Sequence, residues 1–350
     1  MEDFKILLKN ARLKRQLTQL ELSEKTGMAV SVLSKFELGQ RVPNKEQLQA
    51  IGKVLKSDFK QLKTQWLAEK IAKDLYGEPE ALQALQIAEN LFTYKKAPSN
   101  QLDKLLAEAD ALKLQLDKCR PIPKAQLKNL MEAFRISYTY DSNRIEGNTL
   151  TLQETALVVD KGLTIGGKSM RDHLEAMNHA EAFDFIMALA GNAAAVNEYN
   201  LLQIHSIVLK SIDKANAGKY RGVQVLISGS AHTPPSPYMV RPQMEDYFHY
   251  YTLMQGTLHP LLLAADMHEK LVTIHPFIDG NGRTSRLIMN LLIHRSGFPM
   301  VNISGAAQSR MAYYKALDDV QTKGKSDAFR LFLVKEAIRS LKQWLEWVGK

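Results

Sequence analysis

Residues 275–286 hold side chains whose types and spacing could carry out chemistry on phosphates. The segment reads His-Pro-Phe-Ile-Asp-Gly-Asn-Gly-Arg-Thr-Ser-Arg. Pro276 predicts that the preceding helix ends at or near His275, which places the imidazole at a helix–loop junction. An imidazole has an ordinary pKa of about 6.5 and can take up a proton at neutral pH. We therefore expect His275 to act as a proton acceptor.

The rest of this segment predicts an anion site. A turn at Asp279-Gly-Asn-Gly leads into an expected helix over residues 283–293, and helix N-termini present unpaired N–H groups and a positive dipole end. Arg283 and Arg286 are three residues apart and share one face. Two guanidinium groups suit a polyphosphate, and Asp279 fits beside them if a divalent cation bridges it to the phosphates. The alternative, a buried histidine and a helix cap with surface arginines, is favoured for His-Pro alone but not for the whole ordered set.

Composition predicts what kind of molecule positions these residues. A chain of 350 residues, 45% apolar and 24% charged, is typical of a soluble protein with two or three domains. Its single cysteine, Cys119, excludes an internal disulfide and fits a reducing compartment. The N-terminus lacks a signal-peptide pattern, and charged side chains interrupt the most apolar stretch, residues 258–278. We expect a cytoplasmic protein that makes no membrane contact.

The positive charge is concentrated near the N-terminus. Residues 1–76 contain 15 Lys/Arg and 9 Asp/Glu, a balance of +6 out of the net +9. A basic segment of this size suggests contact with phosphate, although a solvated helical surface is the better explanation for charge alone.

Residues 4–66 predict short helices with helix-turn-helix spacing. Thr18 and Glu21 can form a capping box for a helix over residues 19–25, and Gly27 supplies the turn. Further helices are expected over residues 29–38 and 45–55. The strings Leu-Thr-Gln-Leu-Glu-Leu-Ser-Glu-Lys-Thr-Gly and Ser-Lys-Phe-Glu-Leu-Gly-Gln-Arg-Val-Pro resemble the phage-repressor (Cro/C1, or XRE) helix-turn-helix family.

This resemblance covers residues 4–58 and implies that the helix beginning at Ala29 recognises DNA. It also implies a structural pair between Arg12 and Glu37. A protein-docking or oligomerising use of the same domain is the alternative. The residues that the resemblance places against DNA are Gln19, Ser31, Ser34 and Lys35.

The predicted fold is mainly α-helical, in three parts. A helix-turn-helix domain over residues 1–66 is followed by a helical linker over residues 67–119 and a helical domain over residues 120–350. A leucine stripe in the linker indicates packing or a dimer surface. Alternating Val223, Val225 and Ile227 predict a small β-hairpin within residues 219–237. The sequence has no βαβ alternation, no GxGxxG and no Walker A motif, which argues against Rossmann and P-loop folds.

Residues 275–286 match, position for position, the Fic family signature His-Pro-Phe-x-(Asp/Glu)-Gly-Asn-Gly-Arg-x-x-Arg, and residues 120–345 resemble the family more widely. The resemblance implies an all-helical Fic domain that transfers AMP from ATP to a Ser, Thr or Tyr hydroxyl of a target protein and releases pyrophosphate. His275 would deprotonate the hydroxyl, and Asp279 would hold Mg²⁺ or Mn²⁺. Arg283 would bind the β-phosphate and Arg286 the γ-phosphate.

The resemblance implies further nucleotide contacts. The predicted hairpin looks like the family's flap, which holds the target segment by strand addition. The remaining residues implied in nucleotide binding are Gly280, Asn281 and Gly282 of the phosphate-binding turn, Ile227, Ser228 and Gly229 of the flap, and Tyr313, Tyr314 and Gln321 near the nucleoside. For Tyr313 and Tyr314, a core position on an amphipathic helix is the alternative.

Residues 142–147, Ser-Asn-Arg-Ile-Glu-Gly, match the Fic inhibitory motif (Ser/Thr)-x-x-x-Glu-(Gly/Asn), on a helix expected near residues 137–147. A carboxylate at a helix end can form a bidentate pair with Arg286, which would then be denied to the γ-phosphate. The resemblance therefore implies inhibition by Glu146, supported by Ser142 and Gly147. Gly147 can also serve as an ordinary helix cap. Relatives of this subclass often form homodimers, so a homodimer is expected.

Two other functions stay open. On the same fold, some relatives remove AMP by using the equivalent of Glu146 to position water, and others transfer phosphocholine or phosphate. The complete signature argues against the phosphate-transferring branch. Alternatively, the chain is chiefly a transcription regulator whose Fic domain senses nucleotide, although the intact His275 weighs against that.

Overall fold

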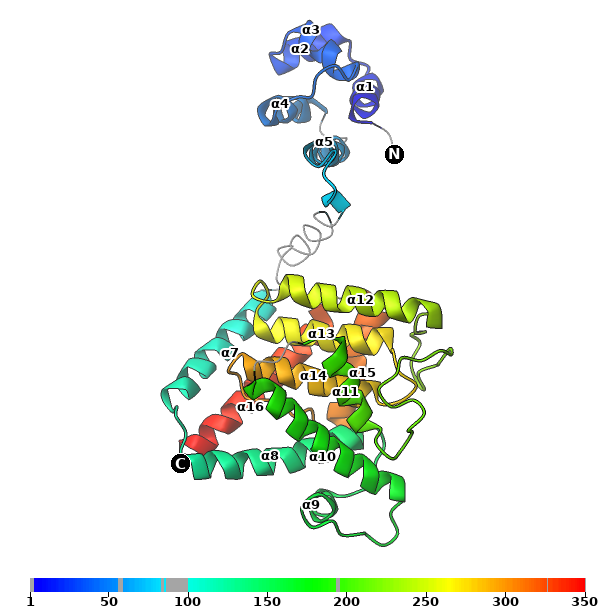
Figure 1. Cartoon of the computed structure of the whole chain (residues 1–350). Coiled ribbons are helices and arrows are strands. Elements are labelled where there is room, and N and C mark those ends of the chain that lie inside the picture. The colour runs from blue at the N-terminus through cyan, green and yellow to red at the C-terminus, as the bar shows by residue number, and fades with distance from the viewer. Residues whose placement is uncertain are drawn as a thin grey trace. The chain divides into compact units, whose positions relative to one another are not determined.

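The structure is a computed structural model that describes residues 3–55, 59–82, 85, 100–192, 196–325 and 327–349. The chain divides into two compact units, Met1–Lys95 and Lys96–Lys350, and each is described by itself (Figure 1). The described residues form α-helices and no β-strand. None of the described helices combines the length and apolar character that a membrane span requires.

The first unit contains the predicted helix-turn-helix. Its Thr18 hydroxyl and the Glu21 carboxylate form the expected capping box, and Gly27 ends the helix in the left-handed region at φ 69°. Trp66 is buried in the core of this unit, and its helix continues to Asp74. The expected domain boundary at residue 66 therefore falls inside a helix. The helices are α1 (Phe4–Lys14), α2 (Gln19–Thr26), α3 (Val30–Glu37), α4 (Lys45–Leu55) and α5 (Phe59–Asp74).

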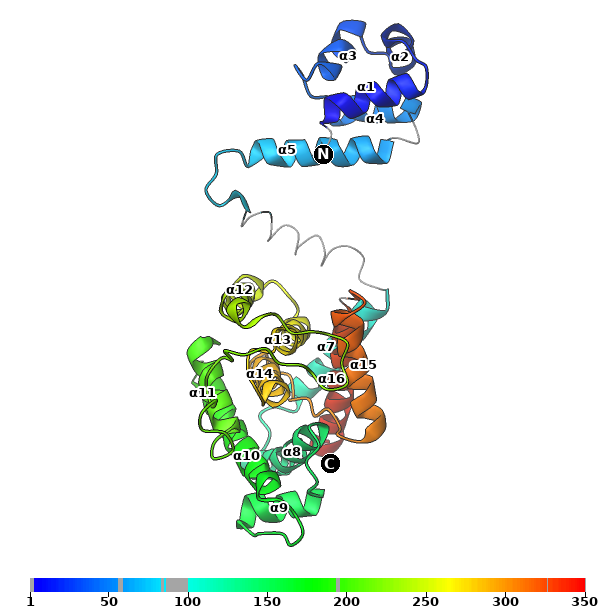
Figure 2. The same cartoon turned by 90° about the vertical axis from the view of Figure 1, so that its right-hand side faces the viewer.

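The second unit is a bundle around one buried helix, α14 (Asn281–Arg295), which packs against α8, α10, α11 and α13 (Figure 2). Its sequence from Leu287 to Ile293 is apolar on nearly every side, as expected of a helix buried all round. The helices around it are α7 (Asn100–Lys118), α8 (Lys124–Ile145), α9 (Leu152–Lys161), α10 (Met170–Gly191), α11 (Glu198–Val208), α12 (Pro237–Met254), α13 (Pro260–Ile274), α15 (Ala307–Gln321) and α16 (Asp327–Val348).

Helix α7, which the sequence suggested was part of a linker, belongs to this second unit. It packs against α16, and Leu102, Ala109 and Leu116 on its stripe are buried. The leucine stripe of residues 102–116 is therefore a packing surface.

The predicted β-hairpin within residues 219–237 is wrong, because this segment is an irregular loop. Side chains donate to backbone carbonyls that a β-ladder would otherwise use. Arg221 donates to the carbonyls of Val223 and Pro235, and the Gln224 amide donates to the carbonyl of Pro234. Two successive prolines, Pro234 and Pro235, also remove backbone donors. An isolated two-stranded hairpin is only marginally stable, so these side-chain bonds decide the conformation.

Candidate active site

His275 lies where predicted, directly after the last residue of α13. Its backbone is left-handed, at φ 51° and ψ 57°, and Pro276 prevents the helix from continuing. The imidazole Nδ1 lies 3.3 Å from the Val272 carbonyl. If this contact is a hydrogen bond, Nδ1 carries the proton, and Nε2 keeps the lone pair that a general base requires. Burial lowers the pKa of His275 and outweighs the Val272 carbonyl, which raises it, so the imidazole is neutral at pH 7.

Arg221 holds the backbone of this histidine in place. Its Nε donates to the His275 carbonyl at 2.8 Å, and its backbone N–H donates to the Pro276 carbonyl at 2.9 Å. The guanidinium is 3% exposed and also bonds two carbonyls of the loop that precedes α12. Arg221 thus joins the loop to residues 275–280, the turn between α13 and α14 that is predicted to be catalytic and is called the catalytic turn. It also stabilises the strained backbone of His275. The sequence pattern did not identify this role.

The turn between α13 and α14 is closed by its own side chains. Asn281 accepts from the Phe277 N–H at 3.0 Å and donates to the Phe277 carbonyl at 2.9 Å. His205 accepts from the Gly218 N–H and so donates through Nε2 to the Asp279 carbonyl, at 2.9 Å. Because the Asn281 amide is used within the turn, its contact with phosphate stays a prediction.

Helix α14 begins at Asn281, two residues before the expected start. Gly280 is its N-cap at φ 79°, a conformation that favours glycine. The Gly280 N–H, expected in the anion site, bonds to Asp279 Oδ1 instead. The N–H groups of Asn281, Gly282 and Arg283 precede the first intrahelical bond, from Thr284 to Gly280, and so make up the helix end at which an anion is predicted to bind.

Arg286 is 1% exposed and lies among polar partners. Ser142 of α8 holds it twice, by accepting from Nε at 3.0 Å through its hydroxyl and from Nη2 at 2.8 Å through its carbonyl. The Tyr313 hydroxyl lies 3.4 Å from Nη1. The alternative in which this arginine is a surface charge is therefore excluded.

Glu146 meets Arg286 at the end of α8. Its Oε1 accepts from Arg286 Nη2 at 2.7 Å, and its side chain is 33% exposed. The contact is a single hydrogen bond and not the bidentate pair expected, because Ser142 occupies Nε. A Cβ on Gly282 would lie 2.3 Å from Glu146 Oε1, so glycine is what lets the carboxylate approach the first turn of α14. Gly147 follows with φ 98°.

Asp279 and Arg283 lie in a charge network that the sequence did not reveal. Asp279 Oδ1 lies 3.1 Å from Arg283 Nη2, and its Oδ2 lies 2.5 Å from Arg171 Nη2. Glu175, also on α10, lies 3.2 Å from Arg283 Nη1. Burial would raise the pKa of Asp279, but Arg283, the Gly280 N–H and Arg171 together hold it below its ordinary value. No local motif marks Arg171 or Glu175, since both are distant in sequence.

The carboxylate of Asp279 fits a divalent cation that is also bound by a nucleotide. The described residues contain no cluster of three or more His, Cys, Asp or Glu side chains that could hold a metal by themselves. Mg²⁺ often takes only one or two carboxylates and completes its shell with substrate phosphates and water. Asp279, with 37% of its side chain exposed beside the anion-binding end of α14, is suited to that arrangement.

The three predicted nucleoside-binding residues all lie on α15. Tyr313 is 2% exposed and lies near Arg286 and His268, which makes it a core residue. Tyr314 donates to the Ile145 carbonyl at 2.8 Å, beside Glu146. Gln321 donates to the Thr273 hydroxyl at 3.0 Å. Nucleoside binding by these residues stays a prediction, as does nucleotide binding by Ile227, Ser228 and Gly229 of the irregular loop.

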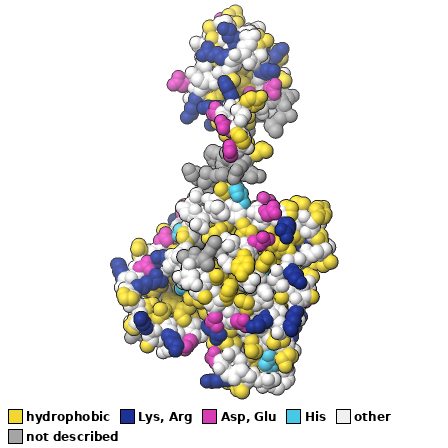
Figure 3. All heavy atoms as spheres, viewed as in Figure 1, with side chains coloured by type: hydrophobic (Ala, Val, Ile, Leu, Met, Phe, Trp, Pro, Cys, Tyr) yellow, Lys and Arg dark blue, Asp and Glu magenta, His cyan; other side chains and the backbone are white. Residues whose placement is uncertain are grey.

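In the first unit, Arg12 and Glu37 form the expected pair, with bonds of 2.7 and 2.9 Å. The Gln19 amide donates to the same carboxylate at 2.8 Å, so this side chain is engaged within the fold. Lysine and arginine side chains are spread over the face of this unit that Figure 3 shows. On α3, Ser31 and Lys35 are exposed and Ser34 is half-buried, as a DNA-facing helix requires.

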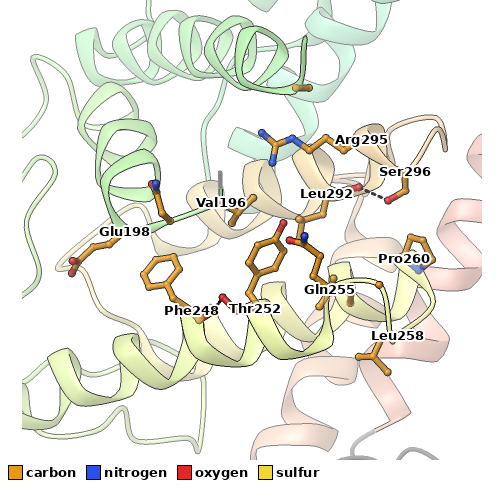
Figure 4. Close-up of a pocket in the computed structure, with 15 residues that line it drawn as sticks. Val196, Glu198, Phe248, Thr252, Gln255, Leu258, Pro260, Leu292, Arg295 and Ser296 are labelled. Carbon is orange, nitrogen blue, oxygen red and sulfur yellow. Dashed lines mark hydrogen bonds between the residues drawn. The ribbon is translucent and has the colours of Figure 1, made fainter. Parts of the chain in front are cut away.

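A cavity of about 1120 Å³ lies away from the catalytic turn (Figure 4). Its lining includes Arg295 and Ser296 at the C-terminal end of α14, whereas the catalytic turn adjoins the N-terminal end. At about 1.5 Å per residue, the two ends of this helix are roughly 20 Å apart. The cavity is therefore separate from the predicted phosphate site.

Known families and proteins are similar to parts of this chain. Residues 195–293 match the Fic/DOC family, and residues 8–62 match a helix-turn-helix family. Protein adenylyltransferase Fic of Nematostella vectensis is 37% identical over 214 residues, which cover 60% of this chain and 49% of the relative. Protein adenylyltransferase fic-1 of Caenorhabditis elegans is 35% identical over 222 residues, covering 63% and 43%. The chain spans less than half the length of these two curated relatives.

Two solved structures have the same fold. Fic-1 (residues 134–508) from C. elegans has a TM-score of 0.63 and 27% identity, with 97% of each chain covered. A Fic domain containing signaling protein from Bacteroides thetaiotaomicron has a TM-score of 0.62 and 27% identity, covering 71% of this chain and 98% of its own. The chain therefore carries a domain of the Fic/DOC family, preceded by a helix-turn-helix domain.

Proposed function

We propose that this protein is an adenylyltransferase that transfers AMP from ATP to a hydroxyl of a target protein and is held inactive by Glu146. The observation that carries the proposal is the 2.7 Å contact between Glu146 Oε1 and Arg286 Nη2. It joins a buried guanidinium at an anion-binding helix end to a carboxylate of the same chain. The names of the curated relatives, protein adenylyltransferases, support the same reaction.

The chemistry follows from the catalytic turn. Nε2 of His275 accepts the proton of a Ser, Thr or Tyr hydroxyl, and the oxygen attacks the α-phosphorus of ATP. The bond from that phosphorus to the oxygen bridging to the β-phosphate breaks, and pyrophosphate leaves. The N–H groups at the start of α14 stabilise the charge that develops on the phosphate. Asp279 would hold Mg²⁺, which would neutralise part of the negative charge on the phosphates.

Competition between Glu146 and the γ-phosphate for Arg286 explains the inhibition. Arg283 and Arg286 bind the β- and γ-phosphates, and an N–H that already donates to a carboxylate is not available to a phosphate. While Glu146 occupies Nη2 of Arg286, the γ-phosphate lacks its partner. ATP then binds weakly or with its α-phosphate out of line, which lowers the rate.

The test uses wild type, Glu146→Gly and Glu146→Gly/His275→Ala, each incubated with Mg²⁺ and ATP radiolabelled at the α-phosphate. We expect little label on wild type and at least about tenfold more on the single variant, in the range of ordinary coupling energies. The double variant should carry none. A single variant that stays unlabelled contradicts inhibition by Glu146, and a labelled double variant contradicts His275 as the base.

A second activity, removal of AMP from a modified target, is favoured by one observation. The Glu146 side chain is one-third exposed and uses only Oε1 in its hydrogen bond with Arg286, so Oε2 can orient a water molecule. Wild type incubated with a protein that the Glu146→Gly variant has already labelled would then release AMP. Label that persists in the presence of wild type rules this second activity out.

We infer that the first unit binds DNA through α3. Its exposed Lys35 and Ser31 and the basic balance of the segment support this use. A gel shift of the protein's own promoter DNA should weaken as salt rises and disappear in Lys35→Glu. Lys53→Glu, which removes an exposed lysine from α4, is the matched control and should keep most of the shift. Absence of a shift in wild type at low salt would favour protein docking instead.

We also infer a cytoplasmic homodimer. The single cysteine, Cys119, is free and exposed, which suits a reducing compartment. The homodimer follows from the resemblance to the subclass with its inhibitory motif ahead of the catalytic motif. Light scattering during size-exclusion chromatography measures the mass of the protein in solution directly. The mass of a single chain at micromolar concentration would contradict the homodimer.

A further inference from the structure

Four charged side chains beside the catalytic turn form a closed ring of alternating sign. Glu175 Oε1 lies 3.1 Å from Arg171 Nε and 3.2 Å from Arg283 Nη1. Asp279 closes the ring, with Oδ1 3.1 Å from Arg283 Nη2 and Oδ2 2.5 Å from Arg171 Nη2. Each oxygen of Asp279 therefore has its own guanidinium.

The members of this ring differ in how firmly they are held. The Arg283 and Glu175 side chains are 2% and 9% exposed, and Glu175 Oε2 also accepts from the Asn148 amide at 3.0 Å. The Asp279 side chain is 37% exposed, and Arg171 is 59% exposed. Arg171, in the first turn of α10, is thus the member that can move while the other three stay packed.

We propose that Arg171 is a resident counter-ion of Asp279, which must release Oδ2 before a divalent cation binds there. This proposal rests on the proposed function, in which Asp279 holds the metal. A cation needs the lone pairs that Arg171 now occupies, and its positive charge repels the guanidinium. Arg283 does not have to move, since it contacts the other oxygen of Asp279.

The proposal adds a restraint that is independent of Glu146. Glu146 competes with phosphate for Arg286, whereas Arg171 competes with the cation for Asp279. The two contacts share no side chain. Release of Arg171 requires only rotation of an exposed side chain, which can keep its Nε contact with Glu175.

The experiment measures Mn²⁺ binding to the full chain without nucleotide, by the electron paramagnetic resonance signal of free Mn²⁺. We expect Arg171→Gln to bind Mn²⁺ roughly three- to tenfold more tightly than wild type, the range for losing one partly exposed repulsive charge. Arg171→Met, which cannot donate a hydrogen bond, should behave in the same way. Asp279→Asn should abolish this binding in either background.

Lys128→Gln is the matched charge control, because Lys128 is exposed on α8 and lies roughly 27 Å along that helix from Glu146 at 1.5 Å per residue. Its Mn²⁺ affinity should equal that of wild type. Unchanged or weaker binding in both Arg171 variants overturns the proposal, as does Mn²⁺ binding that survives Asp279→Asn or is absent throughout. Because nucleotide is left out, the result does not depend on whether AMP transfer occurs.

Discussion

Each unit of this protein contains an arginine–glutamate pair that joins two helices, and the two pairs are built differently. In the first unit, Arg12 donates to both oxygens of Glu37, at 2.7 and 2.9 Å, and both residues are less than a tenth exposed. In the second unit, Arg286 is also buried, but a single hydrogen bond joins it to Glu146, whose side chain is 33% exposed.

The difference separates a structural ion pair from an exchangeable one. A buried bidentate pair fixes the packing of its helices. If either partner left, the charge of the other would stay buried without a counter-ion. Glu146 can leave, because it sits at a helix end, is partly in solvent and uses one oxygen. Ser142 keeps Arg286 in place through two further bonds, so a phosphate would meet a preorganised guanidinium.

Breaking the first pair should have the largest effect. Glu37→Ala leaves Arg12 buried without its partner and should lower the free energy of unfolding of the first unit by about 3–5 kcal/mol. Hydrogen-exchange mass spectrometry of peptides from α1–α5 in the full chain measures this loss. Added ATP and Mg²⁺ should not restore protection. Glu24→Ala, at an exposed site on α2, is the control and should change stability by less than about 0.5 kcal/mol.

Breaking the second pair should cost less and be reversible by nucleotide. Glu146→Gly should lower the stability of the second unit by about 2 kcal/mol, because Arg286 keeps its Ser142 bonds while Glu146 was already partly solvated. ATP with Mg²⁺ at about 100 times its dissociation constant should return roughly 2.7 kcal/mol. Thermal unfolding with and without nucleotide tests this. Equal nucleotide-dependent shifts in wild type and variant would show that Glu146 does not compete with ATP.

Gly282 offers a finer test of how closely Glu146 approaches. A Cβ on Gly282 would lie 2.3 Å from Glu146 Oε1, so Gly282→Ala must displace the carboxylate in wild type but not in Glu146→Gly. In the second background, alanine also favours the helix. A double-mutant cycle on thermal stability should give a coupling energy of about 1 kcal/mol. Additive effects would mean that the carboxylate relaxes at no cost.

The smallest expected effect concerns His275. Burial holds the pKa of its imidazole below the ordinary value of about 6.5, while the Glu146 carboxylate raises it. Removal of that negative charge in Glu146→Gly should lower the His275 pKa further, although only slightly because the carboxylate is partly in solvent. Activity of this variant should therefore be nearly constant from pH 7 to 8 and fall as pH drops through the lowered pKa. NMR titration of the imidazole checks the direction, and an upward shift would contradict it.

Local signals in the sequence predicted most elements of the fold. The Thr18–Glu21 capping box, the turn at Gly27 and the end of α13 at His275 all depend on residues within four positions of one another. Such signals are visible in a sequence because the contacts they report are short-range. The predicted hairpin failed because the deciding bonds came from the buried side chain of Arg221, which no alternation of apolar residues reveals.

By itself, the sequence determined the chemistry available at residues 275–286 and the presence of a glutamate able to oppose it, since both are written as contiguous motifs. Only the tertiary structure decided how those groups are used. It reduced the Glu146 contact to one bond and engaged the Asn281 amide within the turn. It also brought Arg171, 108 residues away, onto Asp279. These outcomes depend on which side chains meet when helices distant in sequence pack together, and helical periodicity fixes the face of a helix but not its partner.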